Sequence, residues 1–305
     1  MKKIYILGSI NMDLSIDVPY IPANGETLEG KDFFSNPGGK GGNQAVAAAK
    51  LGAAPQFIGK LGEDHFGDEL LKILKQNGVL CDNITQVEGV SSGVAVILRS
   101  NGDNRIICDY GANLAILPEE VESILEKNAN PGDLFLTQFE SPTETVFRAL
   151  EKAKALGMTT LFNPAPAREI PDAIYSFIDY LFVNETEAEF LSDESPDTIE
   201  AAEKVLAFFL SKKVQTPIIT LGKKGSIYWE NGEAHLKPGY KVPVKDTTGA
   251  GDTFIGAFTS ELAQGASLNN CVEFATKASA LAVQKIGAQQ SIPTRQEIET
   301  YFKGE

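Results

Sequence analysis

Residues 134–162 of the chain, LFLTQFESPTETVFRALEKAKALGMTTLF, decide the fold. The segment begins and ends with short apolar runs, at 134–137 and 159–162, each of the length of a buried strand. Between them, apolar side chains recur with helical spacing over residues 142–156. Two strands joined through a helix are typical of parallel neighbours in one sheet, because a tight hairpin joins only antiparallel strands. The segment therefore predicts a β-α-β unit.

The same alternation continues on both sides of this unit. Further strands are predicted at 4–7, 57–61, 180–183 and 218–221. The helices predicted around them cover 44–51, 66–78, 198–212, 252–264 and 268–285. Strands separated by helices of this length predict a doubly wound α/β fold, with a mainly parallel sheet flanked by helices. In such sheets ligands bind beyond the carboxyl ends of the strands, so the polar residues at those ends are the candidates for a site.

Two segments, at about 14–36 and 92–111, do not follow this alternation. The first is broken by prolines and glycines, and the second holds two short runs on either side of a turn at 100–103. Runs of this kind around a glycine-containing turn predict a hairpin. We expect both segments to form a small β-sheet lid outside the main sheet. With the rest of the chain they would make a single domain spanning 1–305.

The composition limits what the protein binds. The 305 residues are 43% apolar and 22% charged, which is ordinary for a globular protein, and the formal net charge is −14. Such an acidic chain does not suit nucleic acid or an anionic membrane, although backbone N–H groups can still hold a nucleotide. Three scattered cysteines show no metal-ligand spacing and indicate a reducing compartment. The first apolar run is too short for a signal peptide and no stretch approaches the roughly 20 residues of a membrane span, so we expect a cytoplasmic protein.

Residues 246–254, DTTGAGDTF, carry the strongest indication of chemistry. Small residues precede a helix, so several free N–H groups at the helix start would converge on an anion. Gly249 and Gly251 would let the backbone approach a phosphate closely. Asp252 follows in the first turn, where a carboxylate could take the proton of an attacking hydroxyl. The competing interpretation is that Asp252 only caps the helix, and this segment alone does not decide between the two.

A second glycine-rich helix start lies at 37–45, PGGKGGNQA. It lacks the spacing of a Walker A loop and of a dinucleotide fingerprint. Four glycines around Lys40 and Asn43 favour close approach to a polar ligand over a plain flexible turn. Asn11 and Asp13 follow the first strand and, two residues apart in extended chain, face the same way. Such a pair suits vicinal sugar hydroxyls or, as the commoner alternative, an Asx turn.

Asn184 and Glu187 follow the strand predicted at 180–183. Glu187 could hold a hydrated Mg²⁺, which proteins bind through few carboxylates, or it could form a capping box with Asn184. The two histidines, His65 and His235, lie in a turn and in a polar hairpin and are expected at the surface. Neither has the partners of a hydrolytic triad or of a zinc site, so the sequence does not support those enzyme classes.

Taken together, these segments resemble the ribokinase branch of the PfkB-type carbohydrate kinase family. The likeness runs from residues 8–13, GSINMD, to residues 287–291, GAQQS, and it includes both glycine-rich segments in order. The stretches 138–142 and 163–167 are similar to the ribokinase branch in particular. The resemblance implies transfer of the γ-phosphoryl group of ATP to the 5-hydroxyl of D-ribose, with Mg²⁺ and K⁺ as cofactors. It also implies a homodimer in which the lids pair.

The resemblance assigns a role to each matching position. It implies that the sugar is held by Asn11, Asp13, Gly39, Lys40, Asn43 and Glu140. It makes Asp252 a sugar contact and the general base, beside an anion hole formed by the backbone of Gly249, Ala250 and Gly251. The nucleotide positions that it implies, with Mg²⁺ near the first two, are Asn184, Glu187, Thr220, Gly222, Gly225 and Thr276. The K⁺ positions that it implies are Asp246, Thr248, Ala282, Lys285, Gly287 and Ser291.

Two positions depart from the family pattern. Gly42 stands where alanine is frequent, and Thr276 stands where a larger polar residue often borders the adenine. Two alternative functions also remain open. A related kinase could act on deoxyribose, a nucleoside or a ketohexose, and a catalytically silent sugar-binding protein could share the fold. Asp252 with its glycine-rich anion hole favours an active enzyme, because a silent relative has no need of that carboxylate.

Overall fold

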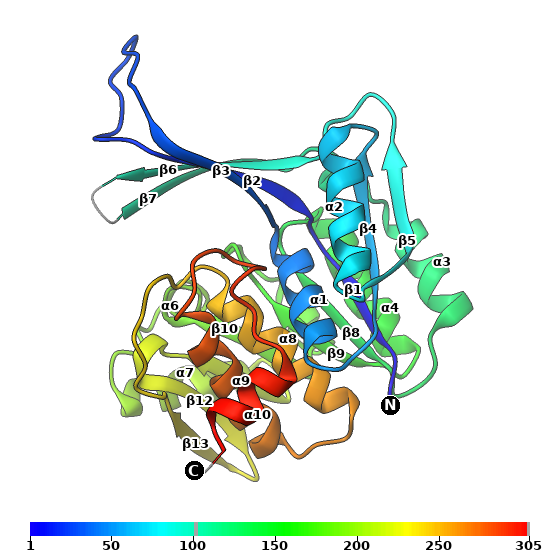
Figure 1. Cartoon of the computed structure of the whole chain (residues 1–305). Coiled ribbons are helices and arrows are strands. Elements are labelled where there is room, and N and C mark those ends of the chain that lie inside the picture. The colour runs from blue at the N-terminus through cyan, green and yellow to red at the C-terminus, as the bar shows by residue number, and fades with distance from the viewer. Residues whose placement is uncertain (101–102, 304–305) are drawn as a thin grey trace.

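A nine-stranded sheet forms the middle of the molecule (Figure 1). The computed structural model describes residues 1–100 and 103–303. The strands of this sheet are β1 (Ile4–Leu7), β4 (Pro55–Gly62), β5 (Leu80–Val87), β8 (Leu134–Gln138), β9 (Thr159–Asn163), β10 (Tyr180–Asn184), β11 (Thr216–Thr220), β12 (Gly225–Glu230) and β13 (Glu233–Pro238). They follow the order β13-β12-β11-β10-β9-β8-β1-β4-β5, and every neighbouring pair from β11 to β5 is parallel. The antiparallel hairpin of β12 and β13 lies at one edge.

Helices cover both faces of this sheet, and each face has its own apolar core. One face is covered by α1 (Lys40–Lys50), α2 (His65–Gln76), α8 (Ala250–Ala263), α9 (Leu268–Ala282) and α10 (Arg295–Tyr301). The other face is covered by α3 (Pro118–Asn128), α4 (Thr143–Ala155), α5 (Asp172–Tyr175), α6 (Glu185–Ser192) and α7 (Ile199–Ser211). Successive residues of β1 alternate between the two cores, with Ile4 and Ile6 in the first and Tyr5 and Leu7 in the second. The prediction of a doubly wound, mainly parallel α/β fold is confirmed.

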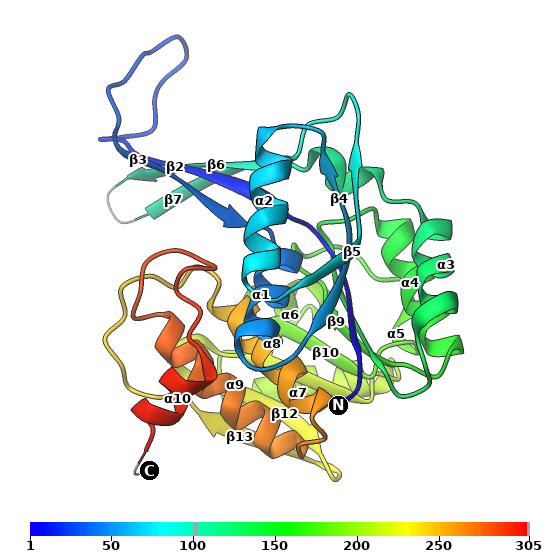
Figure 2. The same ribbon diagram turned by 45° about the vertical axis from the view of Figure 1, so that its right-hand side comes forward.

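A separate four-stranded sheet, called the small sheet below, projects from this body (Figures 1 and 2). Its strands are β2 (Asn11–Asp17), β3 (Lys31–Gly38), β6 (Gly93–Ser100) and β7 (Asp103–Asp109), in the order β3-β2-β6-β7. β2 pairs with β6 in parallel, while the two outer pairs are antiparallel. The strands lie within or beside the segments 14–36 and 92–111 predicted as a lid. The two central residues of the turn predicted at 100–103 lie outside the described residues.

Some element boundaries differ from those predicted. Strand β5 was not predicted, because only one of its side chains is buried and it lacks a clean apolar alternation. The helix predicted at 44–51 begins four residues earlier, at Lys40, inside the glycine-rich segment. The helix predicted at 268–285 ends at Ala282, and the Lys285 N–H then donates to the Ala282 carbonyl in a turn. A helix that begins inside a glycine-rich loop directs its first N–H groups at whatever the loop surrounds.

None of the helices within the described ranges combines the length and the apolar character that crossing a bilayer requires.

All three cysteines are thiols, with Cys81 and Cys271 buried and Cys108 exposed. His65 is exposed, as expected, whereas His235 is partly covered because its ring stacks on Tyr228 at 5.5 Å. Neither histidine lies in a group of side chains that suggests chemistry.

Candidate active site

The carboxyl ends of the parallel strands meet the starts of two helices. β8, β9, β10 and β11 end in polar residues, which are Gln138, Asn163, Asn184 and Thr220. Because these strands are parallel neighbours, the four residues line one edge of the sheet. Helices α1 and α8 pack against each other and both begin at this edge (Figure 2). This edge is where a doubly wound sheet binds its ligands.

Helix α8 begins with a glycine that no other residue could replace without strain. Gly249 precedes the first turn with φ 72°, in the left-handed region, and a Cβ there would lie 3.1 Å from the Cα of Ala288. No side chain caps the helix, and the Ala250 N–H donates to the Thr247 carbonyl at 3.2 Å. A Cβ on Gly251 would meet no atom within 4 Å, so the space beside this turn is open. The first turn of α8 therefore borders an unfilled space, although its Ala250 N–H already donates within the chain.

Asp252 lies in that first turn and is buried. Its side chain does not cap its own helix. Instead, its Oδ2 accepts from the amide of Asn43 at 2.9 Å and its Oδ1 accepts from the amide of Gln44 at 3.0 Å. Both amides come from the first turns of α1, so the two glycine-rich segments meet at one carboxylate.

The start of α1 is tied closely to the chain after β1. Gly39 has φ 84°, and a Cβ there would lie 2.9 Å from the backbone N of Asn11. Glu140, just beyond β8, accepts from the backbone N–H of Lys40 at 3.0 Å and from the hydroxyl of Ser9. The Glu140 carboxylate thus holds the backbone at the start of α1. It also belongs, with Asp13 and Asp252, to a group of three acids that interact electrostatically, called the carboxylate cluster below.

Asn11 and Asp13 start the small sheet at the rim of this site. The Asn11 Oδ1 accepts from the Asn113 amide at 2.8 Å, and Asn113 also bonds both backbone groups of Ile10. Burial raises the pKa of Asp13 to about 7, and the charges of Glu140 and Asp252 add to that shift. A carboxyl with this pKa changes charge near neutral pH. Glu140 and Asp252 lie close enough to interact with that charge.

Lys40 supplies positive charge to this cluster. Burial lowers the pKa of its ammonium, but the carboxylates of Asp252, Glu140 and Glu187 raise it, and the net shift is upward. Lys40 is therefore charged at neutral pH, and it interacts electrostatically with Glu187 as well as with Asp252 and Glu140. A charged amine among acids beside a helix start suits a phosphate group in transfer.

Four of the six residues predicted on the nucleotide side lie along β10, β11 and the turn that follows, whereas Glu187 lies on α6 and Thr276 on α9. Asn184 and Glu187 form a capping box, in which the Glu187 N–H donates to Asn184 at 2.8 Å and the Asn184 N–H donates to Glu187 at 2.9 Å. Burial raises the pKa of Glu187. Thr220 pairs with Asn184 in the sheet register, so the two lie side by side. Thr276, on α9, donates its hydroxyl to the Val272 carbonyl of its own helix at 2.7 Å.

Gly222 and Gly225 enclose a short 3-10 turn between β11 and β12. Both have positive φ, at 52° and 104°. A Cβ on Gly225 would lie 2.0 Å from the Lys237 carbonyl of β13. Only glycine fits there, which keeps this turn close to the sheet edge next to Thr220.

Three of the six predicted K⁺ positions come together. Asp246 accepts from the N–H and the hydroxyl of Thr248 at 2.9 and 2.7 Å, and from the Gly287 N–H at 2.9 Å. Burial raises the pKa of Asp246, but these N–H and hydroxyl donors lower it, and the net shift is downward. Asp246 thereby joins the loop before α8 to the loop after α9.

The remaining three K⁺ positions contribute differently. The Ala282 carbonyl accepts from the Lys285 N–H at 3.1 Å, and the Lys285 ammonium pairs with Glu297 on α10 at 2.9 Å. The Ser291 hydroxyl donates to the Ala288 carbonyl at 2.8 Å. Carboxylate, hydroxyl and carbonyl oxygens on two adjoining loops are the hard donors that an alkali cation requires, so the residues fit the predicted ion.

Among the described residues, no three histidine, cysteine or acidic side chains form a group that could hold a metal ion by themselves.

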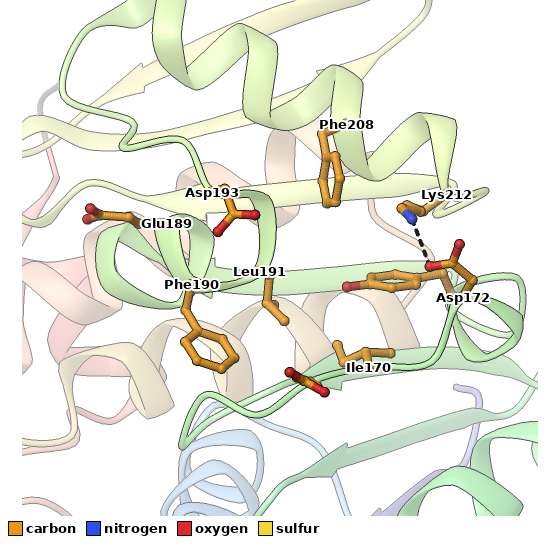
Figure 3. Close-up of a pocket in the computed structure, with 10 residues that line it drawn as sticks. Ile170, Asp172, Glu189, Phe190, Leu191, Asp193, Phe208 and Lys212 are labelled. Carbon is orange, nitrogen blue, oxygen red and sulfur yellow. Dashed lines mark hydrogen bonds and ion pairs between the residues drawn. The ribbon is translucent and has the colours of Figure 1, made fainter.

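A cavity of about 650 Å³ between α5, α6 and α7 contains none of the predicted residues (Figure 3). Its lining is apolar and acidic, and Lys212, its basic residue, pairs with Asp172 at 2.7 Å. A cavity with this charge does not attract phosphates, so the site at the strand ends is the better candidate.

Five residues of the site were not singled out from the sequence: Ser9, Gln44, Asn113, Gln138 and Asn163. Gln44 stands at a glycine-rich helix start, and Gln138 directly follows a predicted strand. Their positions could have identified them, since polar residues at the carboxyl ends of strands are the candidate ligand contacts in this fold. Asn113, in the 3-10 helix Gly111–Ala115, is far from any quoted motif and gives no such signal.

A doubly wound sheet whose carboxyl edge meets two glycine-rich helix starts and a buried carboxylate is the kind of site found in small-molecule kinases. A family model described as pfkB family carbohydrate kinase matches residues 1–295. The ribokinase of Schizosaccharomyces pombe is 41% identical over 316 residues, covering 99% of this chain and 98% of its own. The ribokinase of Haemophilus influenzae is 40% identical over 297 residues, covering 97% of each chain.

A solved structure gives the same result. The Arabidopsis thaliana ribokinase complexed with ribose and ATP matches with a TM-score of 0.91 and 32% identity, over 100% of this chain and 99% of the other. The chain belongs to the pfkB family of carbohydrate kinases.

Proposed function

We propose that this protein phosphorylates D-ribose at the 5-hydroxyl with ATP, giving D-ribose 5-phosphate and ADP. The observation that carries the proposal is Asp252, buried in the first turn of α8 with both oxygens held by amides of α1. The choice of sugar comes from the relatives described above, which are ribokinases matched over nearly the whole chain.

D-ribose would lie between the start of the small sheet and the start of α1. There its hydroxyls would meet Asn11, Asp13, Gly39, Lys40, Asn43 and Glu140. Asn43 supports this placement, because its Oδ1 is buried and meets no hydrogen-bond donor among the described residues. A buried acceptor without a donor is costly, and a sugar hydroxyl would satisfy it.

The chemical step asks the protein for a base and for stabilisation of negative charge. As the 5-oxygen of the sugar attacks the γ-phosphorus, its proton passes to Asp252. The bond from the γ-phosphorus to the β-γ bridging oxygen breaks, and ADP leaves. The first turn of α8, at Gly249, Ala250 and Gly251, would stabilise the charge on the phosphoryl oxygens, together with Lys40.

The triphosphate and ribose of ATP would lie along Asn184, Glu187, Thr220, Gly222 and Gly225, with Thr276 near the adenine. Mg²⁺ bound with ATP supplies charge neutralisation on the phosphates. Glu187 would hold it through water, because one Glu187 oxygen already accepts from the Asn184 N–H. The capping box and a hydrated ion are therefore compatible at one carboxylate.

A monovalent cation, K⁺ in the family, would bind where the loop before α8 meets the loop after α9. Asp246, Thr248, Ala282, Lys285, Gly287 and Ser291 would provide its oxygens, several of them from the backbone. The cation supplies fixed positive charge beside the anion hole. Because Gly249 contacts Ala288 of the same loop, ordering this loop would also order the start of α8.

We further propose that the small sheet is the lid of a single domain and that two copies pair through it. Leu14, Val96 and Ile107 are neighbours in register on the face opposite Asp13, and the side chains of Val96 and Ile107 are exposed. Exposed apolar side chains on one face of a thin sheet favour a second copy as their cover. We expect the enzyme to work in the cytoplasm, where ATP and K⁺ are plentiful.

The deciding experiment measures ADP release from MgATP in K⁺ buffer with D-ribose, 2-deoxyribose, D-fructose and adenosine as acceptors. A clear preference for D-ribose supports the proposal. Preference for another acceptor keeps the kinase and changes the sugar assignment. Folded protein that releases no ADP with any of the four contradicts the proposal and favours a silent sugar-binding protein.

A further inference from the structure

Gln44 stands at the centre of a buried chain of amides behind Asp252. Its Nε2 donates to Asp252 Oδ1 at 3.0 Å and to Asn163 Oδ1 at 3.2 Å. Its Oε1 accepts from the Nε2 of Gln138 at 2.6 Å, and the Asn163 Nδ2 donates to the Phe182 carbonyl at 3.0 Å. These amides come from α1, β8 and β9, and all three are buried.

The two ends of this chain determine how every amide is oriented. The Phe182 carbonyl can only accept, so Asn163 must turn its Nδ2 toward it and its Oδ1 toward Gln44. Gln44 must then direct its Nε2 at Asn163, and the same Nε2 reaches Asp252. A flipped Gln44 would place its oxygen against two acceptors and would lose its bond from Gln138.

The arrangement also depends on the charge of Asp252. An ionised carboxylate is an acceptor only, which matches the two amide donors from Asn43 and Gln44. Each carboxylate oxygen keeps a second lone pair, so the hydrogen bonds leave room for an incoming proton. The two donors, one on each oxygen, fix the plane of the carboxylate.

We propose that Gln44 is a positioning residue for phosphoryl transfer, which orients the Asp252 carboxylate and is itself oriented by Asn163 and Gln138. This inference rests on the proposed role of Asp252 as the base. Gln44 does not touch the reacting atoms. It connects the base to side chains at the ends of β8 and β9. The position of the carboxylate is therefore held by the main sheet as well as by α8.

The test compares the pH dependence of kcat in the wild-type protein and in Gln44→Met. Methionine keeps the length of the side chain but removes the amide. We expect kcat to fall about ten- to a hundredfold, as for a displaced catalytic group, and its acid limb to move to higher pH. The KM values for sugar and ATP should change less than about threefold, since Gln44 meets neither in the proposed site. A folded variant with the wild-type kcat and the wild-type acid limb overturns the inference.

Gln44→Glu keeps the inference testable if the methionine variant does not fold. A protonated glutamic acid can still donate to Asp252, whereas the ionised form repels it. We therefore expect kcat of Gln44→Glu to fall as pH rises through neutrality, opposite to an enzyme limited by ionisation of its base. A pH profile parallel to that of the wild-type protein contradicts the inference.

Two further variants separate positioning from plain stability. Gln138→Met should shift the acid limb in the same direction as Gln44→Met, and the double variant should be no worse than Gln44→Met alone, because Gln138 acts through Gln44. Additive losses in kcat would contradict that chain of action. Thr145→Val, which removes a buried bond to the Ile116 carbonyl at 3.0 Å in α4, is the matched control and should change Tm without moving the pH profile.

Failure of the proposed function and failure of this inference are seen in different samples. The first appears in the wild-type protein alone, as absent ADP release with D-ribose. The second appears only in the ratio of variant to wild-type protein, measured with whichever acceptor the wild-type protein uses.

Discussion

The Asn43 amide donates to Asp252 Oδ2 at 2.9 Å and joins two residues that are 209 positions apart in the chain. That bond makes one site of two glycine-rich helix starts. It is possible because α1 and α8 cross closely: a Cβ on Gly256 of α8 would lie 2.5 Å from both the Ala47 Cβ and the Gln44 carbonyl of α1. The close crossing brings the amides of α1 within hydrogen-bond distance of the carboxylate on α8.

Asp252→Asn tests the proposed base. Asparagine keeps the size of the side chain but cannot take a proton, and its NH₂ would face one of the two amide donors. We expect kcat to fall at least about a hundredfold, the scale of a lost general base, while D-ribose binding measured by calorimetry is largely kept. Asp133→Asn, at another buried aspartate that accepts from the Lys3 N–H at 2.9 Å, serves as the control. Full activity of Asp252→Asn would exclude the mechanism.

Gly256→Ala tests the helix crossing. The added Cβ would meet backbone and Cβ atoms of α1, so the helices must separate, and overpacking of this kind costs about 1–3 kcal/mol. The gain in helix propensity from alanine is about 1 kcal/mol. The cost of overpacking exceeds this gain over most of its range. We expect a lower Tm and a lower kcat, because separation weakens both amide contacts with Asp252.

The comparison is Gly251→Ala, whose Cβ would meet nothing within 4 Å. Its Tm should be unchanged or higher, since alanine favours the helix, while kcat falls because the new methyl group occupies the space proposed for the phosphoryl group. Equal Tm changes in both variants would mean that contact with α1 is not what makes Gly256 necessary.

The fold was largely predictable because it depends on local patterns. The runs at 134–137 and 159–162 and the helix between them all appear as β8, β9 and α4, since both faces of the sheet are covered and these central strands are buried along nearly their whole length. The edge strand β5 escapes prediction for the opposite reason, because its side chains are mostly exposed and carry no clear pattern.

The site was predictable in its parts but not in its connections. The glycine-rich segments identify Asn43 and Asp252 separately, and in the structure the Asn43 amide donates to the Asp252 carboxylate. The roles of Gln44 and Asn113 depend on how α1 packs on α8 and how the 3-10 helix packs on β2, which no local pattern encodes. The residue-by-residue assignments to sugar, nucleotide and cation stay predictions until ligands are bound.

Asp13 should make stability depend on pH in a specific window. Its ordinary pKa is 3.8, and burial, helped by Glu140 and Asp252, raises the folded-state pKa to about 7. Between these values the folded protein holds a proton that the unfolded chain has lost, so this group's contribution to the free energy of unfolding falls as pH rises. Asp13→Asn removes that loss. We expect the Tm of the variant, relative to the wild-type protein without sugar, to rise from pH 5 to pH 8. Parallel Tm curves would show that Asp13 does not titrate in this window.

K⁺ should stimulate the enzyme more than Na⁺ at equal ionic strength. The prediction follows from the loops joined by Asp246, whose carboxylate accepts from Thr248 and Gly287. Asp246→Asn should abolish the preference, because asparagine replaces one of the two acceptor oxygens with an NH₂ donor. Glu297→Gln, which alters the nearby exposed pair with Lys285, should leave the K⁺ response unchanged. Identical rates in KCl and NaCl with the wild-type protein would argue against a cation site.

Ile107→Lys tests pairing through the small sheet. The Ile107 side chain is 65% exposed and lies beside Val96 on the face that does not carry Asp13, so a charge there should leave the sugar-binding face intact. If two copies cover this face, burying the ammonium would oppose association strongly. We expect the wild-type protein to have the mass of a dimer by light scattering after gel filtration, and the variant to have the mass of a monomer. Leu236→Lys, at an exposed position of β13, controls for added charge and should stay dimeric. A dimer that persists in Ile107→Lys would place the interface on another surface.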